Sequence, residues 1–288
     1  MLNSEDRSRI YQIDLDSTET NDARIIAYNY IKPHSTILDV GCACGDFGAL
    51  VSTEKKCTVF GMEFDIKSIE EANKKCVFKR VHQVDLNALK TEEYQEYHNF
   101  FDYITLLDVL EHTVHPAQSL SSLKPYIKQD GFFIVSLPNV SFGDIKVGLL
   151  QNDFTYTDMG VLDKTHLKFF TYKTIAIFFA ELGFEITGRQ AKVSDITTKG
   201  TPYCVKNFIK RDPHSYAYQY VMNVRVSNLE IGALTKLNQD KMILRWPDIK
   251  NELNLIRRRK WINTLLPEGS TGRKIAKSIY EKITKRSS

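Results

Sequence analysis

The sequence predicts an α/β fold, in which a Rossmann-like sheet of about seven mostly parallel strands is followed by a C-terminal helical extension. Short apolar runs alternate with helical stretches along the first half of the chain, at the spacing of βαβ units. The runs are rich in Val, Ile, Leu and Phe, which is typical of strands buried on both faces. The length of 288 residues fits one such domain with an extension.

The apolar periodicity gives the order of the elements. Five strands are expected in the first half of the chain, at residues 36–40, 57–62, 78–84, 101–107 and 132–137. Helical stretches are expected around them, at residues 18–31, up to about Thr53, at 66–75, at 88–98 and again after Pro116.

The second half of the chain is expected to complete the sheet. Residues 138–171 are predicted to be rich in loops, and a helix at 173–182 is expected to end at Gly183. Two further strands are predicted at 184–191 and 216–226. In the second of these, alternate residues share one face: Tyr216, Tyr218, Tyr220, Met222, Val224 and Val226. We therefore divide the chain into a domain at 1–230 and a helical, basic extension at 231–288.

The net charge of +4 is unevenly distributed along the chain. The segment 257–288 holds ten Lys or Arg and two Glu, a net charge of +8, so residues 1–256 are mildly acidic. An acidic body argues against a broad nucleic-acid surface. The composition, 42% hydrophobic and 26% charged, is that of a globular chain and excludes a mostly disordered or fibrous one.

The cysteines and the apolar runs bear on the compartment of the protein. Five cysteines in a long chain predict no disulfide framework. No second Cys pair completes a zinc site with Cys42 and Cys44, and no metal is expected. No run approaches the ~18 apolar residues of a membrane span, and the first residues lack the pattern of a secretory signal. We therefore expect a cytoplasmic protein, with its oligomeric state left open.

The residues that point to a ligand follow the predicted strands. In open α/β sheets, ligands bind at the carboxyl ends of the strands. Gly41 and Gly45 follow the first strand, and Glu63, Asp85 and Asp108 close the next three. One acid or glycine at the end of a strand is common without a ligand, whereas such residues at the ends of four successive strands indicate a binding site.

The loop after the first strand does not suit a cofactor that carries phosphates. A dinucleotide fingerprint requires Gly-x-Gly-x-x-Gly, but its third and sixth positions here are Ala43 and Asp46. An acid at the second of these would repel a pyrophosphate at a helix N-terminus. Gly41 and Gly45 permit a close approach of the backbone, and Glu63 is placed to accept hydrogen bonds from two ribose hydroxyls. An adenosine that carries a cationic sulfonium instead of phosphates fits such an acidic site.

Residues Ile37–Gly45, with the sequence ILDVGCACG, resemble the first motif of class I S-adenosylmethionine (SAM)-dependent methyltransferases, with Ala43 in place of the usual glycine. Residues 101–112 resemble the fourth motif of the ubiquinone-methyltransferase-like branch of that family. The resemblance covers about residues 35–140 and implies SAM as the cofactor. It also implies the residues that bind SAM: Asp39, Gly41 and Gly45 toward the methionine part, Glu63 toward the ribose, and Asp85 with Leu86 toward the adenine. Cys42, Phe64 and Leu107 are further candidates for binding the cofactor.

The segment 136–171 resembles a bacterial sub-branch whose members often accompany genes for surface polysaccharides and glycosyl transfer. The residues that carry this resemblance are SLPNV at 136–140, Leu149 and Leu150, FTY at 154–156 and DKTHLKFFT at 163–171. The resemblance informs the class of enzyme more than the acceptor, because most substrates in that branch are unassigned.

Four residues are the candidates for catalysis. Methyl transfer from a sulfonium is an in-line displacement, so orienting donor and acceptor supplies much of the catalysis, and a hydroxyl acceptor also benefits from a positioned base. His166 is the first candidate base, and Asp163 is expected to orient its imidazole. His112 is the second, and Asp108 is expected to lie near the sulfonium or the acceptor. The alternative is structural: Asp163 caps a turn, His166 packs against Phe169, and His112 makes a hydrogen bond at a helix start.

Two further features of this region have alternative interpretations. His112 and His115, with Asp108 and Glu111, have the composition of a divalent metal site, but such groups more often form a hydrogen-bonded cluster. Aromatic residues crowd the segment that is expected to cover the pocket, where they stack on a sugar or only close the site: Phe142, Phe154, Tyr156, Phe169 and Phe170. Tyr11 is a candidate to fold over the cofactor site.

The sequence therefore predicts a SAM-dependent methyltransferase that O-methylates a sugar of a surface glycan, or of its nucleotide- or lipid-linked precursor. One alternative is a small-molecule methyltransferase of the quinone or secondary-metabolite type. An alternative from another class is a non-catalytic SAM-binding module that serves a partner.

The basic end of the chain leaves three interpretations open. A last helix is expected from about Thr271, with Ile275, Ile279 and Ile283 on one stripe and lysines around it. It either rests on the domain as a solvated helix, lies on an anionic membrane, or contacts a glycosyltransferase or an acidic glycan through residues 257–288.

Overall fold

We describe a computed structural model of the chain, in which residues 20–197 and 200–265 are described, with side chains as far as Arg257. Tyr11, the start of the helix expected at 18–31, and the helix expected from Thr271 lie outside the described residues. The same holds for most of the segment 257–288, for which a membrane or glycosyltransferase contact is predicted.

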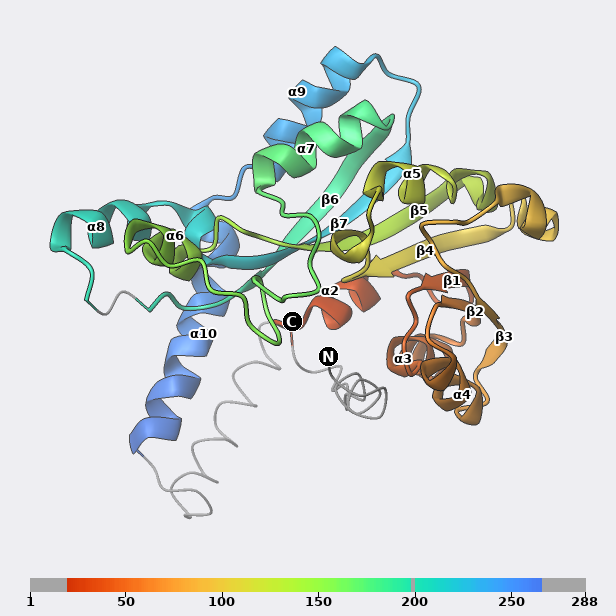
Figure 1. Cartoon of the computed structure of the whole chain (residues 1–288), viewed down its shortest axis with the longest axis horizontal. Helices are drawn as coiled ribbons and strands as arrows, with labels where there is room; N and C mark the ends of the chain where they lie inside the picture. Colours follow the sequence, from red (N-terminus) through yellow and green to blue (C-terminus); the bar gives the residue numbers. More distant parts are fainter. Residues whose placement is uncertain (1–19, 198–199, 266–288) are drawn as a thin grey trace.

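One mixed sheet of seven strands organises the described residues (Figure 1). Its order is β3-β2-β1-β4-β5-β7-β6; the first five of these are parallel, and β7 runs antiparallel to both of its neighbours. The predicted Rossmann-like, mostly parallel sheet is therefore confirmed. The strands are β1 Thr36–Val40, β2 Thr58–Glu63, β3 Phe78–Gln83, β4 Phe101–Leu107, β5 Ile127–Pro138, β6 Phe184–Val193 and β7 Ala217–Val226.

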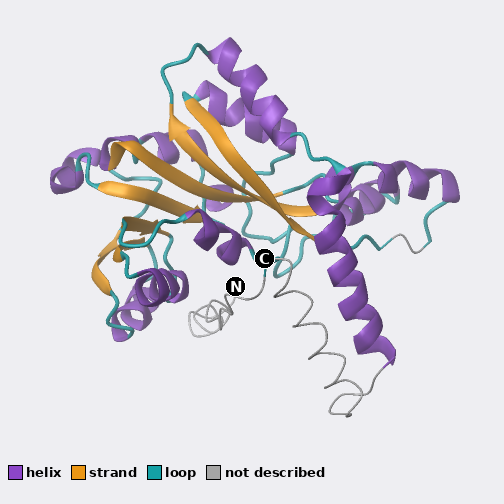
Figure 2. Ribbon diagram, turned by 180° about the vertical axis from the view of Figure 1, so that it is seen from behind, coloured by secondary structure: helices purple, strands orange, loops and turns teal. Residues whose placement is uncertain are grey.

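Helices connect and cover these strands (Figure 2). The α-helices are α2 Ala23–Tyr30, α3 Asp46–Lys55, α4 Ile66–Lys74, α5 Pro116–Ser121, α6 Gly143–Leu150, α7 Tyr172–Glu181, α8 Tyr203–Arg211, α9 Ile231–Met242 and α10 Trp246–Leu265. Short 3-10 turns are η1 Thr91–Tyr97, η2 Leu110–His112, η3 Lys124–Tyr126 and η4 Pro213–Tyr216.

Four elements differ from the prediction. Helix α6 lies in the segment that was expected to be loops. It was not predicted because Gly143 and Gly148 weaken its helical pattern. Helix α8 was not predicted, and the stretch expected as a helix at 88–98 is the 3-10 turn η1, interrupted at Tyr94 by non-helical backbone. Strand β5 also starts earlier than expected, since Ile127 already pairs with Phe101.

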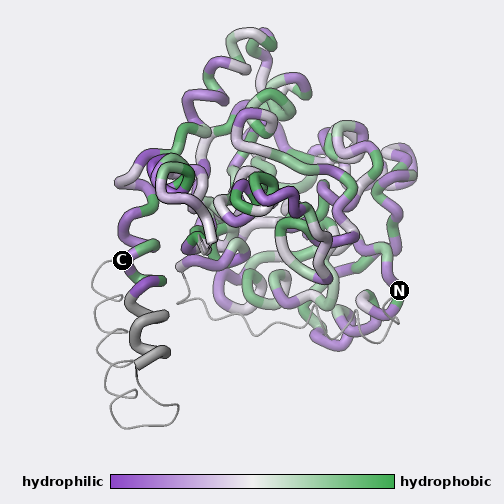
Figure 3. Tube along the Cα trace, turned by 60° about the vertical axis from the view of Figure 1, so that its left-hand side comes forward, coloured by the Kyte–Doolittle hydropathy of each residue, from purple (hydrophilic) through white to green (hydrophobic). Residues whose placement is uncertain are grey.

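The core lies on both faces of the sheet, because successive residues of each central strand point to opposite sides. Ile37 of β1 and Val221 of β7 pack with α2 and α3 on one face. Leu38 and Met222, the next residues along these strands, pack with α5, α7 and α9 on the other. Hydrophobic and hydrophilic stretches alternate along the covering helices (Figure 3), as expected of helices with one buried side.

The helical extension packs against the sheet. Helix α9 contacts α7 and β6 (Figure 1), where the buried Asn238 accepts a hydrogen bond from the Ile186 amide (2.8 Å) and donates to the Phe184 carbonyl (2.9 Å). Arg189 of β6 pairs with Asp248 of α10. In the described part of the chain, no helix is both long enough and apolar enough to span a membrane.

Candidate active site

The candidate site begins with the loop after β1, at the edge where β2, β1 and β4 end side by side. Gly41 has a backbone φ of +70°, and its amide donates to the Met62 carbonyl (2.7 Å). A Cβ at this position would meet Val109 Cγ2 at 2.5 Å, so the close approach of the loop to the turn after β4 requires glycine. Ala43 has a φ of +46°, a conformation that costs a non-glycine residue about 1–2 kcal/mol. The departure from the family motif at Ala43 is therefore accommodated with strain.

Glu63, at the end of β2, ties this loop to the next one. Its Oε2 accepts a hydrogen bond from the Ala43 amide (2.9 Å), and its Oε1 accepts from the amides of Phe64 (2.8 Å) and Asp65 (2.9 Å). A carboxylate has about four acceptor positions, so Glu63 retains capacity for a hydroxyl donor. The Phe64 side chain beside it is 67% exposed.

Asp39, in β1, carries a buried acceptor without a partner. Its Oδ1 accepts a hydrogen bond from Thr105 Oγ1 (2.7 Å), whereas its Oδ2 is buried and has no hydrogen-bond partner. Burial, with a smaller contribution from the charge of Glu63, raises the pKa of Asp39 to about 7 against the opposing effect of the Thr105 bond. Since an unpaired buried polar atom is costly, this end of the sheet fits a ligand that brings a positive charge or a donor.

The other residues predicted to bind the cofactor lie along the same edge. The Cys42 thiol packs toward Gly61 of β2 and is buried, which raises its pKa. Asp85 is exposed and accepts hydrogen bonds from the amide (2.9 Å) and side chain (3.1 Å) of Asn87. All nine predicted residues lie on or directly after the carboxyl ends of the first four strands; the remaining members are Gly45, at the start of α3, and the half-buried Leu86 and Leu107.

Asp108 follows β4 in a strained conformation, with a backbone φ of +59°. Its amide donates to Ser136 Oγ (2.8 Å), and its Oδ1 accepts hydrogen bonds from Ser136 Oγ (2.8 Å) and from Gln219 Nε2. Gln219 Nε2 also donates to Ser136 Oγ (3.0 Å). Residues of β5 and β7 therefore fix the Asp108 carboxylate, which suits it to positioning a reactant.

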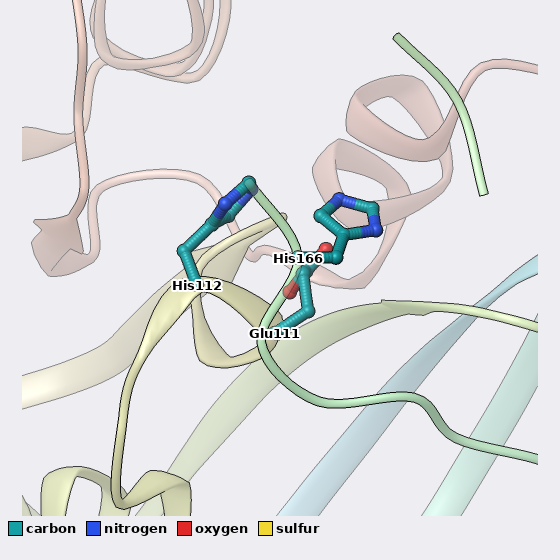
Figure 4. Close-up of side chains that lie close together, drawn as sticks. All are labelled: Glu111, His112 and His166. Carbon is teal, nitrogen blue, oxygen red and sulfur yellow. The ribbon is translucent and has the colours of Figure 1, made fainter. Parts of the chain in front are cut away.

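Glu111, His112 and His166 form a cluster next to this turn (Figure 4). Glu111 and His112 come from η2, and His166 comes from the loop that crosses it; one carboxylate oxygen and one ring nitrogen from each histidine lie within 4.8 Å of one another. The rings of His112 and His166 meet edge to face, with centroids 4.7 Å apart. These atoms have the identity and spacing to hold a divalent cation. The predicted partners of such a site are not brought together, because His115 and Asp108 are not part of this group.

The carboxyl group of Glu111 is the most isolated polar group of the cluster. It is fully buried, and both of its oxygens have no hydrogen-bond partner. Burial raises its pKa well above the usual value, and the nearby charge of Asp108 raises it further. Burial lowers the pKa of His112, and the neighbouring His166 adds to this effect. His112 is therefore held as a neutral imidazole near pH 7.

Hydrogen bonds to the backbone orient both imidazoles. His166 Nδ1 lies 3.1 Å from the Val161 carbonyl, which can only accept, so Nδ1 carries the hydrogen and Nε2 is the basic nitrogen. His112 Nδ1 is bound in the same way by the Thr165 carbonyl (3.2 Å). The orienting role predicted for Asp163 is wrong: its Oδ1 accepts from the Thr165 amide (2.8 Å) and hydroxyl (2.7 Å), which caps the turn, and a carbonyl holds His166 instead.

Aromatic side chains continue from the cluster along the same loop. The Phe169 ring contacts His166 (centroids 6.4 Å apart), and Phe154 and Tyr156 contact Phe169 at 5.9 and 6.3 Å. Phe154 and Tyr156 are exposed, so this group is not a buried core. Phe142 and Phe170, by contrast, are buried.

Sequence reasoning missed the contribution of β7 to the site. Gln219 holds Asp108, as described above, and the Tyr218 hydroxyl lies close to Gly160, where an added Cβ would meet it at 2.8 Å. A polar residue inside an apolar strand, as at Gln219, was the available indication.

The other histidines lie apart from the cluster. His214 is buried and stacks on Tyr172; burial lowers its pKa to about 4, and it accepts a hydrogen bond from the Leu244 amide (3.1 Å). His82 is buried beside Tyr97. Of the seven histidines, all of which are described, only His112 and His166 lie together with a carboxylate in a candidate metal-binding group.

Comparison with known proteins identifies the fold and the family. The model of a methyltransferase domain family matches residues 18–188. A ubiquinone biosynthesis O-methyltransferase of Neisseria meningitidis serogroup C is 24% identical over 193 residues, which cover 64% of this chain and 76% of the relative. The protein of the same name from serogroup A is 24% identical over 125 residues, 41% of this chain and 52% of the relative.

Solved structures share the fold at low sequence identity. A SAM-dependent methyltransferase from Aquifex aeolicus is 13% identical with a TM-score of 0.51, over 77% of this chain and 98% of that one. The structure of StiE O-MT residues 961–1257 is 11% identical with a TM-score of 0.52, over 85% and 86%. Since the family match covers more than half of the sequence, the chain belongs to the methyltransferase domain family and is a class I SAM-dependent methyltransferase.

Proposed function

We propose that the chain transfers the methyl group of SAM to a hydroxyl oxygen of a sugar, in a surface glycan or in its nucleotide- or lipid-linked precursor. The observation that carries this proposal is the pair of imidazoles at the end of β4, oriented by backbone carbonyls so that each presents a basic Nε2. A hydroxyl must lose its proton as its oxygen is methylated, and a positioned imidazole is the commonest base for that step.

The residues at the ends of β1 and β2 are proposed to hold the cofactor. SAM supplies, when bound, a methyl group on a cationic sulfonium. The unpaired oxygen of Asp39 offers an acceptor to a positively charged group, and the free acceptor capacity of Glu63 suits ribose hydroxyls. Gly41 keeps the loop clear of side chains at that edge.

His166 is proposed as the base. Its Nδ1–H is held by the Val161 carbonyl, which leaves Nε2 to take the proton of the acceptor hydroxyl. His112 is proposed to share this task or to position the acceptor, and its lowered pKa keeps it neutral and able to accept a proton. Asp108, fixed by Ser136 and Gln219, is proposed to position the acceptor.

Two observations support a sugar as the acceptor. The segment 136–171, which contributes His166 and the aromatic group, resembles the polysaccharide-associated sub-branch. Phe154 and Tyr156 expose their rings beside Phe169, which contacts His166, and aromatic faces offer apolar contact area to a ring-shaped acceptor.

A second candidate acceptor is a phenolic hydroxyl of a quinone-type small molecule. It is favoured by the similarity to the Neisseria meningitidis proteins, which carry the name ubiquinone biosynthesis O-methyltransferase. The same arrangement of base and cofactor residues serves this acceptor, so only the substrate distinguishes the two candidates.

Product mass analysis tests the proposal. The protein is incubated with SAM and with nucleotide sugars, glycan extracts or hydroxylated quinones, and products that gain one CH₂ unit are identified by mass spectrometry. A product only from the quinone set would replace the sugar acceptor by the second candidate. Binding of SAM without any methylated product would favour the non-catalytic module.

A matched pair of variants tests the base. His166→Ala is expected to lose about 10²-fold or more in turnover while its SAM affinity, measured by calorimetry, stays unchanged. His115→Ala is the control, because this histidine is exposed at the start of α5 and its side chain caps no amide. Equal turnover in the two variants would refute the assignment of His166 as the base.

A further inference from the structure

Large apolar side chains are exposed at one end of the molecule. Leu149 and Leu150, at the end of α6, are 53% and 63% exposed, and Tyr203 and Phe208 of α8 are 78% and 80% exposed. We call these four residues the α6–α8 patch. Phenylalanine is usually buried in soluble domains, so an almost fully exposed ring beside other apolar side chains indicates an interaction surface.

The two helices that carry these four residues lie next to each other. Helices α6 and α8 contact each other, and a Cβ on Gly200, just before α8, would lie 3.8 Å from Gln151 Nε2, just after α6. Figures 1 and 2 show the two helices side by side at the edge of the molecule. Ile209, on the inner side of α8, is 2% exposed and anchors the helix.

The charge of α8 favours an anionic partner. The stretch 202–211 holds Lys206, Lys210 and Arg211 and no acidic residue. Asp212, which follows α8, is paired with Lys146 of α6. The helix therefore combines two projecting aromatic rings with three positive charges. Aromatic and leucine side chains next to Lys and Arg are typical of segments that lie in the interface of a membrane.

We propose that the α6–α8 patch docks the protein on the surface of an anionic lipid bilayer. The two aromatic rings and the two leucines enter the interface, and the three basic side chains of α8 face the acidic headgroups. The chain that leaves α6 leads through Phe154 and Tyr156 to the loop of His166, so docking of α6 ties the bilayer surface to the segment that carries this histidine. The proposal goes beyond the proposed function and does not depend on the identity of the acceptor.

Vesicle co-sedimentation of the full chain tests the proposal. We expect the protein to sediment with vesicles of phosphatidylcholine that contain phosphatidylglycerol, to sediment weakly with phosphatidylcholine alone, and to be released by added salt. Replacing both rings in Tyr203→Ser/Phe208→Ser is expected to weaken binding to the anionic vesicles about tenfold or more. The readout does not involve methyl transfer, so it is independent of whether the acceptor is a sugar.

Two further variants sharpen the test. Leu229→Ser/Ile231→Ser is the matched control, because these side chains are 52% and 56% exposed but belong to the turn after β7 and the first residue of α9; its vesicle binding is expected to equal that of the unmodified chain. In Phe208→Trp, the new indole is expected to be quenched by brominated lipids.

Four results would overturn the proposal, three of them from sedimentation. The first is the absence of sedimentation with anionic vesicles, and the second is an equal loss of vesicle binding in Tyr203→Ser/Phe208→Ser and in its control. The third is unchanged vesicle binding in Tyr203→Ser/Phe208→Ser, which would assign the binding to the basic end of the chain. Concentration-dependent dimerisation that Tyr203→Ser/Phe208→Ser abolishes would assign the patch to a second copy instead.

Discussion

Replacing Asp39 with Asn removes a carboxylate that the fold buries without a full set of partners. One of its oxygens is bound by Thr105 and the other has no partner, and burial raises the pKa to about 7. The folded state therefore holds the proton of Asp39 more tightly than the unfolded state does. The stability associated with this proton is fully present below the unfolded pKa of 3.8 and is lost as the pH rises toward 7.

The magnitude follows from the two pKa values. A change in pKa from 3.8 to about 7 corresponds to about 4 kcal/mol in the free energy of unfolding when the group is ionised in both states. About 2 kcal/mol of this is already lost at pH 5, where only the unfolded state is largely ionised. We therefore expect the stability of Asp39→Asn, relative to the unmodified protein, to increase by about 2–3 kcal/mol between pH 5 and pH 8.

Urea unfolding at pH 5 and pH 8 measures this difference. Comparing the two pH values cancels the constant cost of any unpaired amide hydrogen in Asn. Asp102→Asn is the control of opposite sign. Hydrogen bonds from Lys128 (2.8 Å) and from the Thr36 amide (2.7 Å) outweigh burial and lower the pKa of Asp102. The loss of this carboxylate therefore destabilises the protein at pH values above the unfolded pKa. A stability difference between Asp39→Asn and the unmodified chain that is the same at both pH values would refute the reasoning.

The pH dependence of the affinity for SAM is a second measurement of the ionisation of Asp39. If the ionised carboxylate attracts the cationic SAM, the affinity for SAM rises as the fraction ionised increases, by up to about tenfold between pH 6 and pH 8 for a pKa of about 7. Calorimetric titration at the two pH values measures the change. In Asp39→Asn this pH dependence is expected to disappear, and its persistence would remove Asp39 from the cofactor site.

Three further predictions concern the rest of the site. Gly41→Ala would place a methyl group 2.5 Å from Val109 Cγ2 at a φ of +70°, so we expect SAM affinity, measured by calorimetry, to fall at least about tenfold; unchanged affinity would contradict the close approach. Glu111→Gln removes a buried carboxyl group whose raised pKa costs stability once the unfolded chain is ionised, so it is expected to raise the free energy of unfolding at pH 8, relative to the unmodified chain, while turnover falls; a destabilised variant would show that the carboxyl group has a partner. Gln219→Leu releases the Asp108 carboxylate and is expected to lower kcat without changing the KM for SAM in steady-state assays; a higher KM for SAM would place Asp108 on the cofactor instead.

Local patterns were sufficient to predict most of the sheet. The strands at 36–40 and 101–107 are mostly apolar and were predicted with the bounds that the structure has. The early start of β5 escaped prediction because Gln129, Asp130 and Gly131 interrupt its apolar pattern, and only the pairing of Ile127 with Phe101 reveals it. Helix α8 escaped for a related reason, since its two exposed aromatic residues blur the division between an apolar and a polar side.

The residues of the site also divide into those that could be predicted from the sequence and those that could not. Those that end neighbouring parallel strands, such as Asp39 and Glu63, were placed together by topology alone, because the carboxyl ends of such strands meet at one edge. The partners of each side chain depend on contacts between distant segments. Asp163 stands three residues before His166, yet it bonds to Thr165, and the carbonyl of Val161 orients the imidazole. Sequence proximity favours a carboxylate as the partner, whereas the path of the loop decides which acceptor reaches the ring.

The path of that loop is fixed by the backbone of Glu111 rather than by its side chain. The amides of Leu167 and Lys168 both donate to the Glu111 carbonyl, at 2.8 and 3.1 Å, and the Val140 amide binds the Phe170 carbonyl (2.9 Å) on the far side. These bonds place His166 against His112 whatever side chain residue 111 carries. The carboxylate is thus not required to dock the loop, although it is fully buried without a partner at an energetic cost. A costly group that the local architecture does not need is most readily explained by a role in the chemistry of the site, which is why the stability and the turnover of Glu111→Gln are expected to change in opposite directions.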